Sequence, residues 1–248
     1  MDIDRKGGSV KILVVNDDSI HAPGIVYLAE AAAEFGEVTV VAPAEQCSAL
    51  SQKLTLRDHL TLEQVKNFPV PVKAAYQLDG TPVDCVKVAL DYILADKPDY
   101  VFSGINNGYN VGFDIAYSGT LGAAFEAARQ GIPAMAFSIA ANNHLPSAKS
   151  SLVPMIRELL RRDLEPWSVW NVNFPALNKV AHQGILWDCP VAVVSLFREK
   201  YIEAGFAGEK IILHNQGIPT ENDRIPRGTD AEGVRKGYTT VSKVKCTL

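Results

Sequence analysis

Apolar runs alternate with helical segments along the first 175 residues, and this alternation restricts the fold more than any other feature. Each run is continuous, which is typical of strands buried on both faces of a parallel sheet. The runs lie at residues 11–17, 37–43, 99–104, 133–140 and 168–175. The helical segments between them lie at 23–36, 81–96, 120–130 and 152–164. Strands separated by helices predict right-handed βαβ units, and therefore an α/β fold around a mostly parallel sheet.

The pattern changes beyond about residue 180. Residues 184–197, 210–217 and 237–248 are strand-like with no long helix between them, and 229–237 has the composition of a short turn and helix. We expect antiparallel hairpins in this part of the chain. The predicted organisation is a first part at 1–180 and a β-rich extension at 181–248, joined in one structural unit.

Composition excludes some classes of partner. The chain has 248 residues, is 47% hydrophobic, and carries a formal net charge of −4 with no long basic run. Binding of a nucleic-acid polymer through a basic surface is therefore not expected. A protein of this charge that handles anions needs a metal ion or backbone amides to do so.

The cysteines and the apolar runs bear on location. Cys47, Cys85, Cys189 and Cys246 are far apart and form no CxxC pair. The apolar run near the N-terminus is shorter than the roughly seven to fifteen residues of a signal peptide core. No stretch approaches the roughly eighteen apolar residues of a membrane helix. The sequence predicts a soluble cytoplasmic protein with reduced thiols and no membrane partner.

Two adjacent aspartates, Asp17 and Asp18, follow the first apolar run in "VNDDSIHAPG". Ligands of open parallel sheets bind at the carboxyl ends of the strands, so the loops after successive strands should meet there. Oxygen-bearing side chains in these loops are Asn16, Asp17, Asp18, Ser19, Glu45, Gln46, Ser48, Asn106, Asn107, Asp114, Ser118 and Thr120. Such ligands suit Mg²⁺, Mn²⁺ or Ca²⁺ rather than zinc. Alternatively, one aspartate caps the next helix and the other is solvated.

Other residues indicate an anion site. Ser118, Gly119 and Thr120 begin a helix, where free amides favour phosphate, although plain N-capping is the alternative. The loop at 103–112 is rich in glycine and asparagine, so its backbone can approach a ligand closely, or it is an ordinary long turn. The histidines form no spaced ligand set, and His21 is predicted to be a surface residue. GxGxxG after the first strand, GxxxxGK[ST] and GxSxG are all absent.

Several segments together resemble the survival protein E (SurE) family. They are "ILVVNDDSIHAPGI", "VVAPAEQCSALS", "LDGTPVDCVKVAL", "FSGINNGYNVGFDIAYSGTLGAAFEAA", "NVNFP" and "GTDAEGVRKGYTTVS", in the family's order. The resemblance covers most of residues 11–175 and about the last twenty. It implies a Rossmann-like, doubly wound fold whose C-terminal β-rich extension joins subunits into a homodimer or homotetramer.

The resemblance also implies an activity, a metal and a ligand set. The family is similar to metal-dependent phosphatases that act on nucleoside 5′- and 3′-monophosphates, with some activity on short polyphosphate. The implied cofactor is one divalent ion per subunit, Mg²⁺ or Mn²⁺. Its implied ligands are Asp17, Asp18, Ser48 and Asn106. Asp17 and Asp18 are also the candidate catalytic residues, and the candidate phosphate-binding residues are Ser103, Gly104, Asn107, Ser118, Gly119 and Thr120.

The chain departs from the family pattern at two places. Ser19 stands where the family usually has glycine, and a serine there costs roughly 1 kcal/mol or more if the position needs a positive φ. The segment "CSALS" lacks the usual arginine and glycine, and Ser51 is an alternative to Ser48 as the ligand.

Other interpretations stay open. Attack by a metal-activated water and direct aspartyl attack are both compatible with the residues. A metal-dependent nucleotide or sugar transferase of similar architecture is a second possibility. A non-catalytic receiver-like module is a third, but it would need an acceptor aspartate after a middle strand, where this chain has Asn106.

Overall fold

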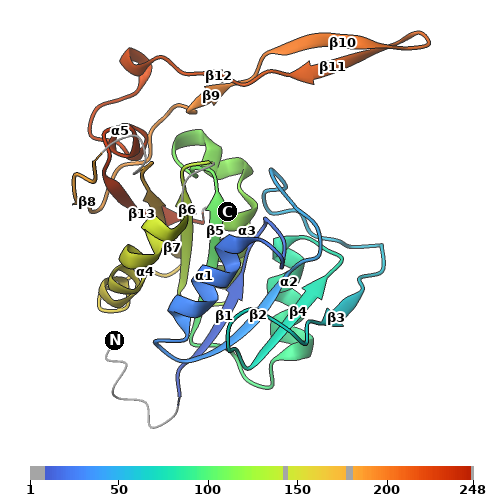
Figure 1. The fold of residues 1–248 in the computed structure, drawn as a ribbon, viewed down its shortest axis with the longest axis vertical. Helices are drawn as coiled ribbons and strands as arrows, with labels where there is room; N and C mark the ends of the chain where they lie inside the picture. The colour runs from blue at the N-terminus through green and yellow to red at the C-terminus, as the bar shows by residue number, and fades with distance from the viewer. Residues whose placement is uncertain (1–8, 142–144, 177–180, 247–248) are drawn as a thin grey trace.

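The computed structural model describes residues 9–141, 145–176 and 181–246. A nine-stranded sheet runs through the molecule in the order β3-β4-β2-β1-β5-β6-β7-β13-β8 (Figure 1). Its strands are β1 (Lys11–Val15), β2 (Glu37–Pro43), β3 (Leu62–Gln64), β4 (Ala74–Leu78), β5 (Tyr100–Asn107), β6 (Ala134–Ile139), β7 (Ser168–Phe174), β8 (Ile185–Leu186) and β13 (Thr239–Lys245). The six strands from β4 to β7 are mutually parallel, and β3 and β13 add antiparallel pairs outside them. The predicted α/β fold with a mostly parallel sheet is confirmed.

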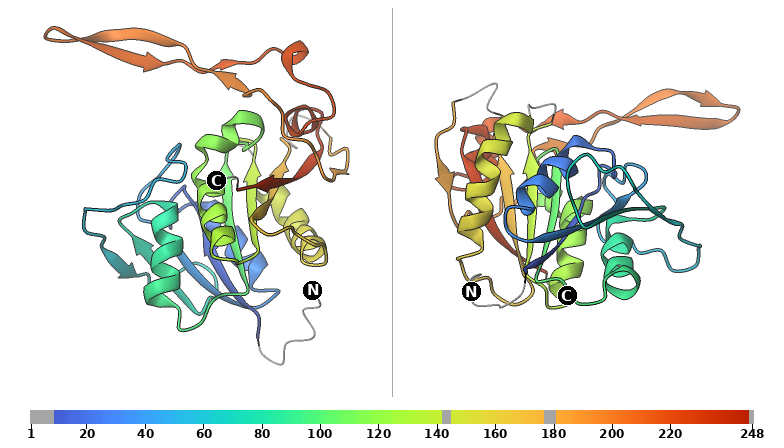
Figure 2. Two further views of the ribbon diagram at one scale, coloured as in Figure 1. Left: turned by 180° about the vertical axis from the view of Figure 1, so that it is seen from behind. Right: turned by 60° about the horizontal axis from the view of Figure 1, so that its bottom comes forward.

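Helices cover both faces of the sheet (Figure 2). They are α1 (Pro23–Ala32), α2 (Pro82–Val88), α3 (Gly119–Arg129), α4 (Leu145–Leu159) and α5 (Asp230–Arg235). Helices α1 and α4 pack on one face, and α2 and α3 on the other. Alternate residues of β1 join the two cores: Ile12 and Val14 face the α1–α4 side, and Leu13 and Val15 the α2–α3 side. The continuous apolar run of β1 is therefore explained by burial on both faces.

Most predicted helices exist with shifted ends. Pro23 is at the start of α1, and Thr81 forms a capping box with Asp84 at the start of α2. The helix predicted at 81–96 exists as far as Ile93, but its second half, Ala89–Ile93, is π-helical and the chain is extended at Leu94. Helix α4 begins before the predicted 152 and ends before 164.

The C-terminal part differs more from the prediction. The strand predicted at 184–197 is wrong, because only two short strands form there, β8 and β9 (Phe197–Arg198), and they do not pair with each other. The apolar residues between them include Ala192 and Leu196, which pack with Val111 in a separate small core. The predicted helix near 229–237 is confirmed as α5. Strands β3 and β4, in a stretch for which the sequence predicted no element, extend the sheet beyond β2.

An antiparallel hairpin projects from the body. It consists of β10 (Tyr201–Ala207) and β11 (Lys210–Asn215), and a short pair of β9 with β12 (Ile218–Pro219) joins it to the body (Figure 1). We call residues 197–219 the arm. Antiparallel pairing in this part of the chain is confirmed, and β11 matches the strand predicted at 210–217, but its partner β10 was not predicted. The boundary at residue 180 stays a prediction, because 177–180 lie outside the described residues.

The direction of winding reverses between β1 and β5. From β1 the chain proceeds through β2 to β4 on one side, and from β5 through β6 to β7 on the other. Such a switch point opens a crevice at the carboxyl ends of the two strands, where doubly wound proteins bind ligands. The loops that follow β1, β2 and β5 meet at this point of the sheet.

Candidate active site

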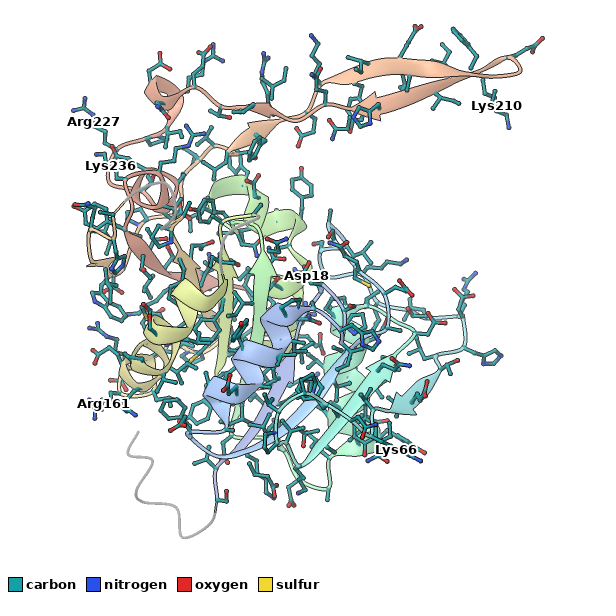
Figure 3. The ribbon with its side chains drawn as sticks, in the orientation of Figure 1. Asp18, Lys66, Arg161, Lys210, Arg227 and Lys236 are labelled. Atoms are coloured by element: carbon teal, nitrogen blue, oxygen red, sulfur yellow. The ribbon has the colours of Figure 1, made fainter. Side chains whose placement is uncertain are left out.

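The aspartate pair lies at this switch point, directly after β1 (Figure 3 labels Asp18). Asp17 faces the first turn of α3, where Thr120 donates to it twice: the amide to Oδ2 at 3.1 Å and the hydroxyl to Oδ1 at 2.7 Å. A carboxylate at a helix N-terminus is favoured by the free amides and the positive end of the helix dipole. The alternative that one aspartate caps the next helix is wrong, because α1 has no side-chain cap and Asp17 instead accepts from the first turn of α3, far along the chain.

Burial makes the Asp17 carboxylate costly. The residue is 4% exposed. Loss of solvation raises its pKa from 3.8 to about 6, the Thr120 hydroxyl opposes that rise, and the neighbouring Asp18 adds to it. A nearby cation would reverse this balance, because it would stabilise the charged form of both carboxylates.

Asp18 connects the other two loops. Its Oδ2 accepts the backbone amide of Asn107 at 2.9 Å, and its Oδ1 accepts the side-chain amide of Gln46 at 3.3 Å. The same Gln46 nitrogen donates to Ser48 Oγ at 3.0 Å. The predicted residues Asp18, Ser48 and Asn107 are thus brought together from the loops after β1, β2 and β5.

Polar oxygens with no partner gather near the pair. Asn16 and Ser103 are both fully buried, and neither Asn16 Oδ1 nor Ser103 Oγ has a hydrogen-bond partner in the described structure. Ser103 is in register with Val15, one residue before Asn16. Asn106 donates its side-chain amide to the Gly108 carbonyl at 2.8 Å, which directs its Oδ1 away from that carbonyl. Unsatisfied buried oxygens are rare and indicate a missing partner.

The predicted phosphate-binding residues behave differently from one another. Ser118 caps α3 by accepting the Leu121 amide at 3.1 Å, so the capping alternative holds for its side chain. Gly119 lies against Asp17, because an added Cβ would be 2.9 Å from the Asp17 Oδ2 and Cβ atoms. Gly104, with φ +129°, packs against β6, since an added Cβ would be 2.3 Å from the Phe137 carbonyl oxygen.

The structure describes both places where the chain departs from the family pattern. Ser19 has φ 92°, so the positive φ that the sequence argument considered is present. Ser51 donates its hydroxyl to the Ala116 carbonyl at 2.7 Å and its amide to Tyr117 at 3.0 Å, and so ties its loop to the segment before α3. Cys47 donates its amide to the Asp17 carbonyl at 2.7 Å, and its thiol pKa is raised mainly by burial.

The sequence argument gave no role to Gln46, which bridges Asp18 and Ser48, or to the buried asparagines of β7 beneath the loop after β5. The "N-x-N" spacing in "NVNF" could have indicated the latter, because it places both amides on one face of a strand. His21 is exposed, as predicted. Among the described residues, no group of three or more His, Cys, Asp or Glu side chains could hold a metal ion, so an ion beside the aspartate pair would need neutral oxygens as its further ligands. No helix in the described part of the chain is long and apolar enough to cross a membrane.

Comparison with known proteins adds independent information. The family model "Survival protein SurE" matches residues 12–195. A protein of Clostridium botulinum (strain Loch Maree / Type A3) named 5′-nucleotidase SurE is 39% identical over 94% of this chain and 92% of its own. One of the same name from Geobacter sulfurreducens is 45% identical over 68% of this chain and 63% of its own.

A solved structure agrees with the observed fold. The crystal structure of the SurE protein from Aquifex aeolicus superimposes with a TM-score of 0.80 at 31% identity, over 96% of this chain and 94% of that one. The match includes the parallel sheet with its C-terminal strands. With the family model and the curated relatives, it shows that this chain belongs to the survival protein SurE family.

Proposed function

We propose that the chain is a hydrolase that cleaves nucleoside monophosphates, a 5′-nucleotidase like the relatives whose name carries that activity. The observation that carries the proposal is the buried Asp17 beside Asp18 at the switch point of the sheet, where the loops after β2 and β5 meet them. Activity on 3′-monophosphates and short polyphosphate, implied by the family resemblance, is part of the proposal.

The site residues fit a divalent cation. Two adjacent carboxylates, one of them nearly fully buried, repel each other unless a positive charge offsets them. The neutral oxygens around them are the hard ligands that Mg²⁺ and Mn²⁺ prefer. Asp17, Asp18, Ser48 and Asn106 would hold one such ion per subunit. When bound, it would polarise a phosphate oxygen and lower the pKa of a water molecule.

The chain's own groups supply the remaining functions. Asp18 is less buried than Asp17 and is the better placed of the two to accept a proton from a water molecule. Asp17, with both oxygens engaged by Thr120, is held as a fixed charge. Ser103 Oγ, which has no partner in the described structure, is available to a phosphate oxygen, and the backbone amides near Gly104, Asn107 and Ser118–Thr120 line the same crevice. Direct attack by an aspartate would instead give a phospho-enzyme, which a beryllium fluoride complex bonded to a carboxylate would reveal.

The arm supports a proposal about assembly. Its large apolar side chains are exposed, among them Tyr201, Phe206, Ile211, Ile212 and Leu213. A projecting ribbon with an apolar surface is a site for association, and a second copy of the chain is the partner that closed symmetry favours. We propose a homodimer or homotetramer joined through the arm. A cytoplasmic location stays a prediction of the sequence.

The test of the activity is phosphate release from a panel of 5′- and 3′-nucleoside monophosphates with Mn²⁺, Mg²⁺ or EDTA. Asp17→Asn should lower turnover at least about a hundredfold, since it removes a charge from the reacting centre. Asp58→Asn, at an exposed position outside the site, is the matched control and should leave turnover unchanged. Turnover that survives EDTA, or that Asp17→Asn leaves intact, would contradict the proposal. Release of a transferred sugar or nucleotide instead of phosphate would favour the transferase.

A further inference from the structure

Three asparagines are buried under the loop that follows β5. Asn110 in the loop, and Asn171 and Asn173 on β7, are each at most 5% exposed. The site described above makes no use of their side chains. Burying several polar amides is costly unless each finds partners, so their arrangement needs a reason.

Most of their side-chain bonds converge on Asn110, and the side-chain amide of Asn173 also donates to Asn171 Oδ1 at 3.4 Å. The backbone amide of Asn110 donates to Asn173 Oδ1 at 2.8 Å, and its carbonyl accepts from the side chains of Asn171 at 2.8 Å and Asn173 at 3.1 Å. Its own side-chain amide donates to Ser138 Oγ on β6 at 2.8 Å. Side chains of two neighbouring strands therefore take the place that a backbone ladder would have, and they fix one residue of an irregular loop.

The fixed residue is close to the site along the chain. The Gly108 amide donates to the Ile139 carbonyl at 2.9 Å, and the Gly108 carbonyl accepts the Asn106 side chain at 2.8 Å. The Asn107 amide donates to Asp18 Oδ2 at 2.9 Å. Three residues separate Asn106 from the anchored Asn110, and one of them, Gly108, has a φ of +156°. Movement of Asn110 would thus be passed to Asn107, whose amide donates to Asp18, and to Asn106 next to it in the chain.

We propose that Asn110, Asn171 and Asn173 form a positioning network that sets the place of Asn106 and Asn107 beside Asp18, and so the affinity of the site for its divalent ion. The metal part of the inference rests on the proposed function. The network residues do not touch the ion or the substrate, and they act only through the loop. This gives the "NVN" segment of β7 a role that differs from holding the sheet together.

The test compares Asn171→Ala with Ser242→Ala. Asn171→Ala removes one donor from the Asn110 carbonyl but leaves the Asn173 donor, so the sheet should still form. Ser242 lies on β13 in register with Asn171, is 1% exposed, and its hydroxyl has no partner in the described structure. Its replacement removes a buried oxygen from the same layer without touching the loop. Ser138→Ala, which frees the Asn110 side chain, is a second variant with the same expectation.

Two measurements separate positioning from plain stability. Hydrogen exchange of the peptide covering residues 105–112, in EDTA, should be at least about tenfold faster in Asn171→Ala than in the wild type or Ser242→Ala. The dissociation constant for Mn²⁺, from the electron paramagnetic resonance signal of the free ion, should rise at least about fivefold in Asn171→Ala and less than about twofold in Ser242→Ala.

Each outcome is decisive. Unchanged exchange in both Asn171→Ala and Ser138→Ala would overturn the network, and faster exchange with unchanged Mn²⁺ affinity would overturn its coupling to the site. An equal loss of affinity in Ser242→Ala would mean that general destabilisation is the cause. If the wild type itself binds no Mn²⁺, the proposed metal site fails and the coupling fails with it, whereas the exchange result still decides whether the asparagines hold the loop.

Discussion

Strands β7 and β10 have the same length and a similar apolar content, yet every residue of β7 is buried and all residues of β10 except Gly205 are exposed. β7 has a strand on each side and contributes side chains to the cores on both faces of the sheet, whereas β10 pairs only with β11. A two-stranded ribbon without further cover is marginal in water. Burial of a strand in this chain therefore follows the number of its neighbours and not its apolar content. We therefore expect the body to be stable by itself and the arm to depend on a second surface.

Removing the apolar surface of the arm should have the greatest effect on the protein, because the arm then loses the surface proposed to hold a second subunit. Phe206 and Ile211 face each other across the hairpin and are 66% and 55% exposed. If each subunit of a dimer buries both side chains, the interface buries four of them. Phe206→Ser with Ile211→Ser would then weaken the free energy of association by about 6 kcal/mol or more, at about 1.5–3 kcal/mol per side chain. The mass in solution at micromolar concentration should fall to that of the 26.9 kDa monomer.

Glu209→Gln, in the turn of the hairpin, is the control and should leave the mass unchanged. If the wild type is itself a monomer at these concentrations, the proposed assembly is wrong and the exposed apolar ribbon needs another explanation. If the double variant also melts well below the wild type at equal subunit mass, the body is not independent of the arm.

The second prediction concerns the buried charge of the body. Because the pKa of Asp17 rises from 3.8 to about 6 on folding, the folded protein binds the proton more tightly than the unfolded chain. The stability this provides is full below pH 4 and is lost as the pH rises through 6, a change of about 3 kcal/mol at about 1.4 kcal/mol per pH unit. Chemical unfolding in EDTA at pH 4–7.5 should show this decline.

Asp17→Asn should remove most of that decline, and Mn²⁺ should oppose it in the wild type at pH 7 because a bound cation favours the charged carboxylate. A wild-type stability that rises steadily over the same pH range, with Asp17→Asn following it in parallel, would mean that the buried carboxylate is not the titrating group.

The third prediction compares a glycine of the body with one of the arm. An added Cβ at Gly119 would be 2.9 Å from Asp17, whereas at Gly217 the nearest atom is 3.9 Å away on Phe197. Gly119→Ala should therefore displace the carboxylate and lower turnover about a hundredfold, the effect of a misplacement of about 1 Å. Steady-state rates should stay within about twofold for Gly217→Ala. Equal rates for both variants would mean that Asp17 tolerates displacement, and its proposed role would be weakened.

The contrast between strands buried on both faces and strands with few neighbours also explains how much of the structure the sequence could predict. The body strands were predicted because burial on both faces leaves continuous apolar runs. The loops of the candidate site were predicted to meet because parallel strands end at one edge of a sheet. The segment 184–197 is as apolar as a strand, yet Ala192 and Leu196 pack with Val111 and α5 without a ladder. Strand β4 was missed because its "AAYQL" sequence is only partly buried and follows a proline-rich stretch. An apolar pattern specifies burial, but not which partner supplies the hydrogen bonds.

The site shows the same limit at the level of single residues. The sequence identified the carboxylates and loops, since their chemistry is carried by residue type. It could not show that Gln46 joins Asp18 to Ser48, because that bond depends on the path of the loop after β2. Likewise, the convergence of Asn171 and Asn173 on Asn110 depends on strand order across the sheet. For Ser19, the sequence argument predicted strain only if the position needs a positive φ, and the observed φ meets that condition.

The smallest expected effect is at that residue, next to the aspartate pair. Ser19 has φ 92°, a region that a residue with a Cβ rarely adopts, and its hydroxyl accepts the His21 amide at a long 3.3 Å. Ser19→Gly should relieve the strain and stabilise the protein by about 0.5–1 kcal/mol, the gain being reduced by the greater freedom of glycine in the unfolded chain. Ser19→Ala separates the two contributions, because it removes the hydroxyl and keeps the Cβ. Urea unfolding should therefore show a gain for glycine alone. An equal gain for alanine would place the cost in the hydroxyl rather than in the backbone, and a loss for glycine would mean that the loop before α1 is held in its conformation by Ser19 itself.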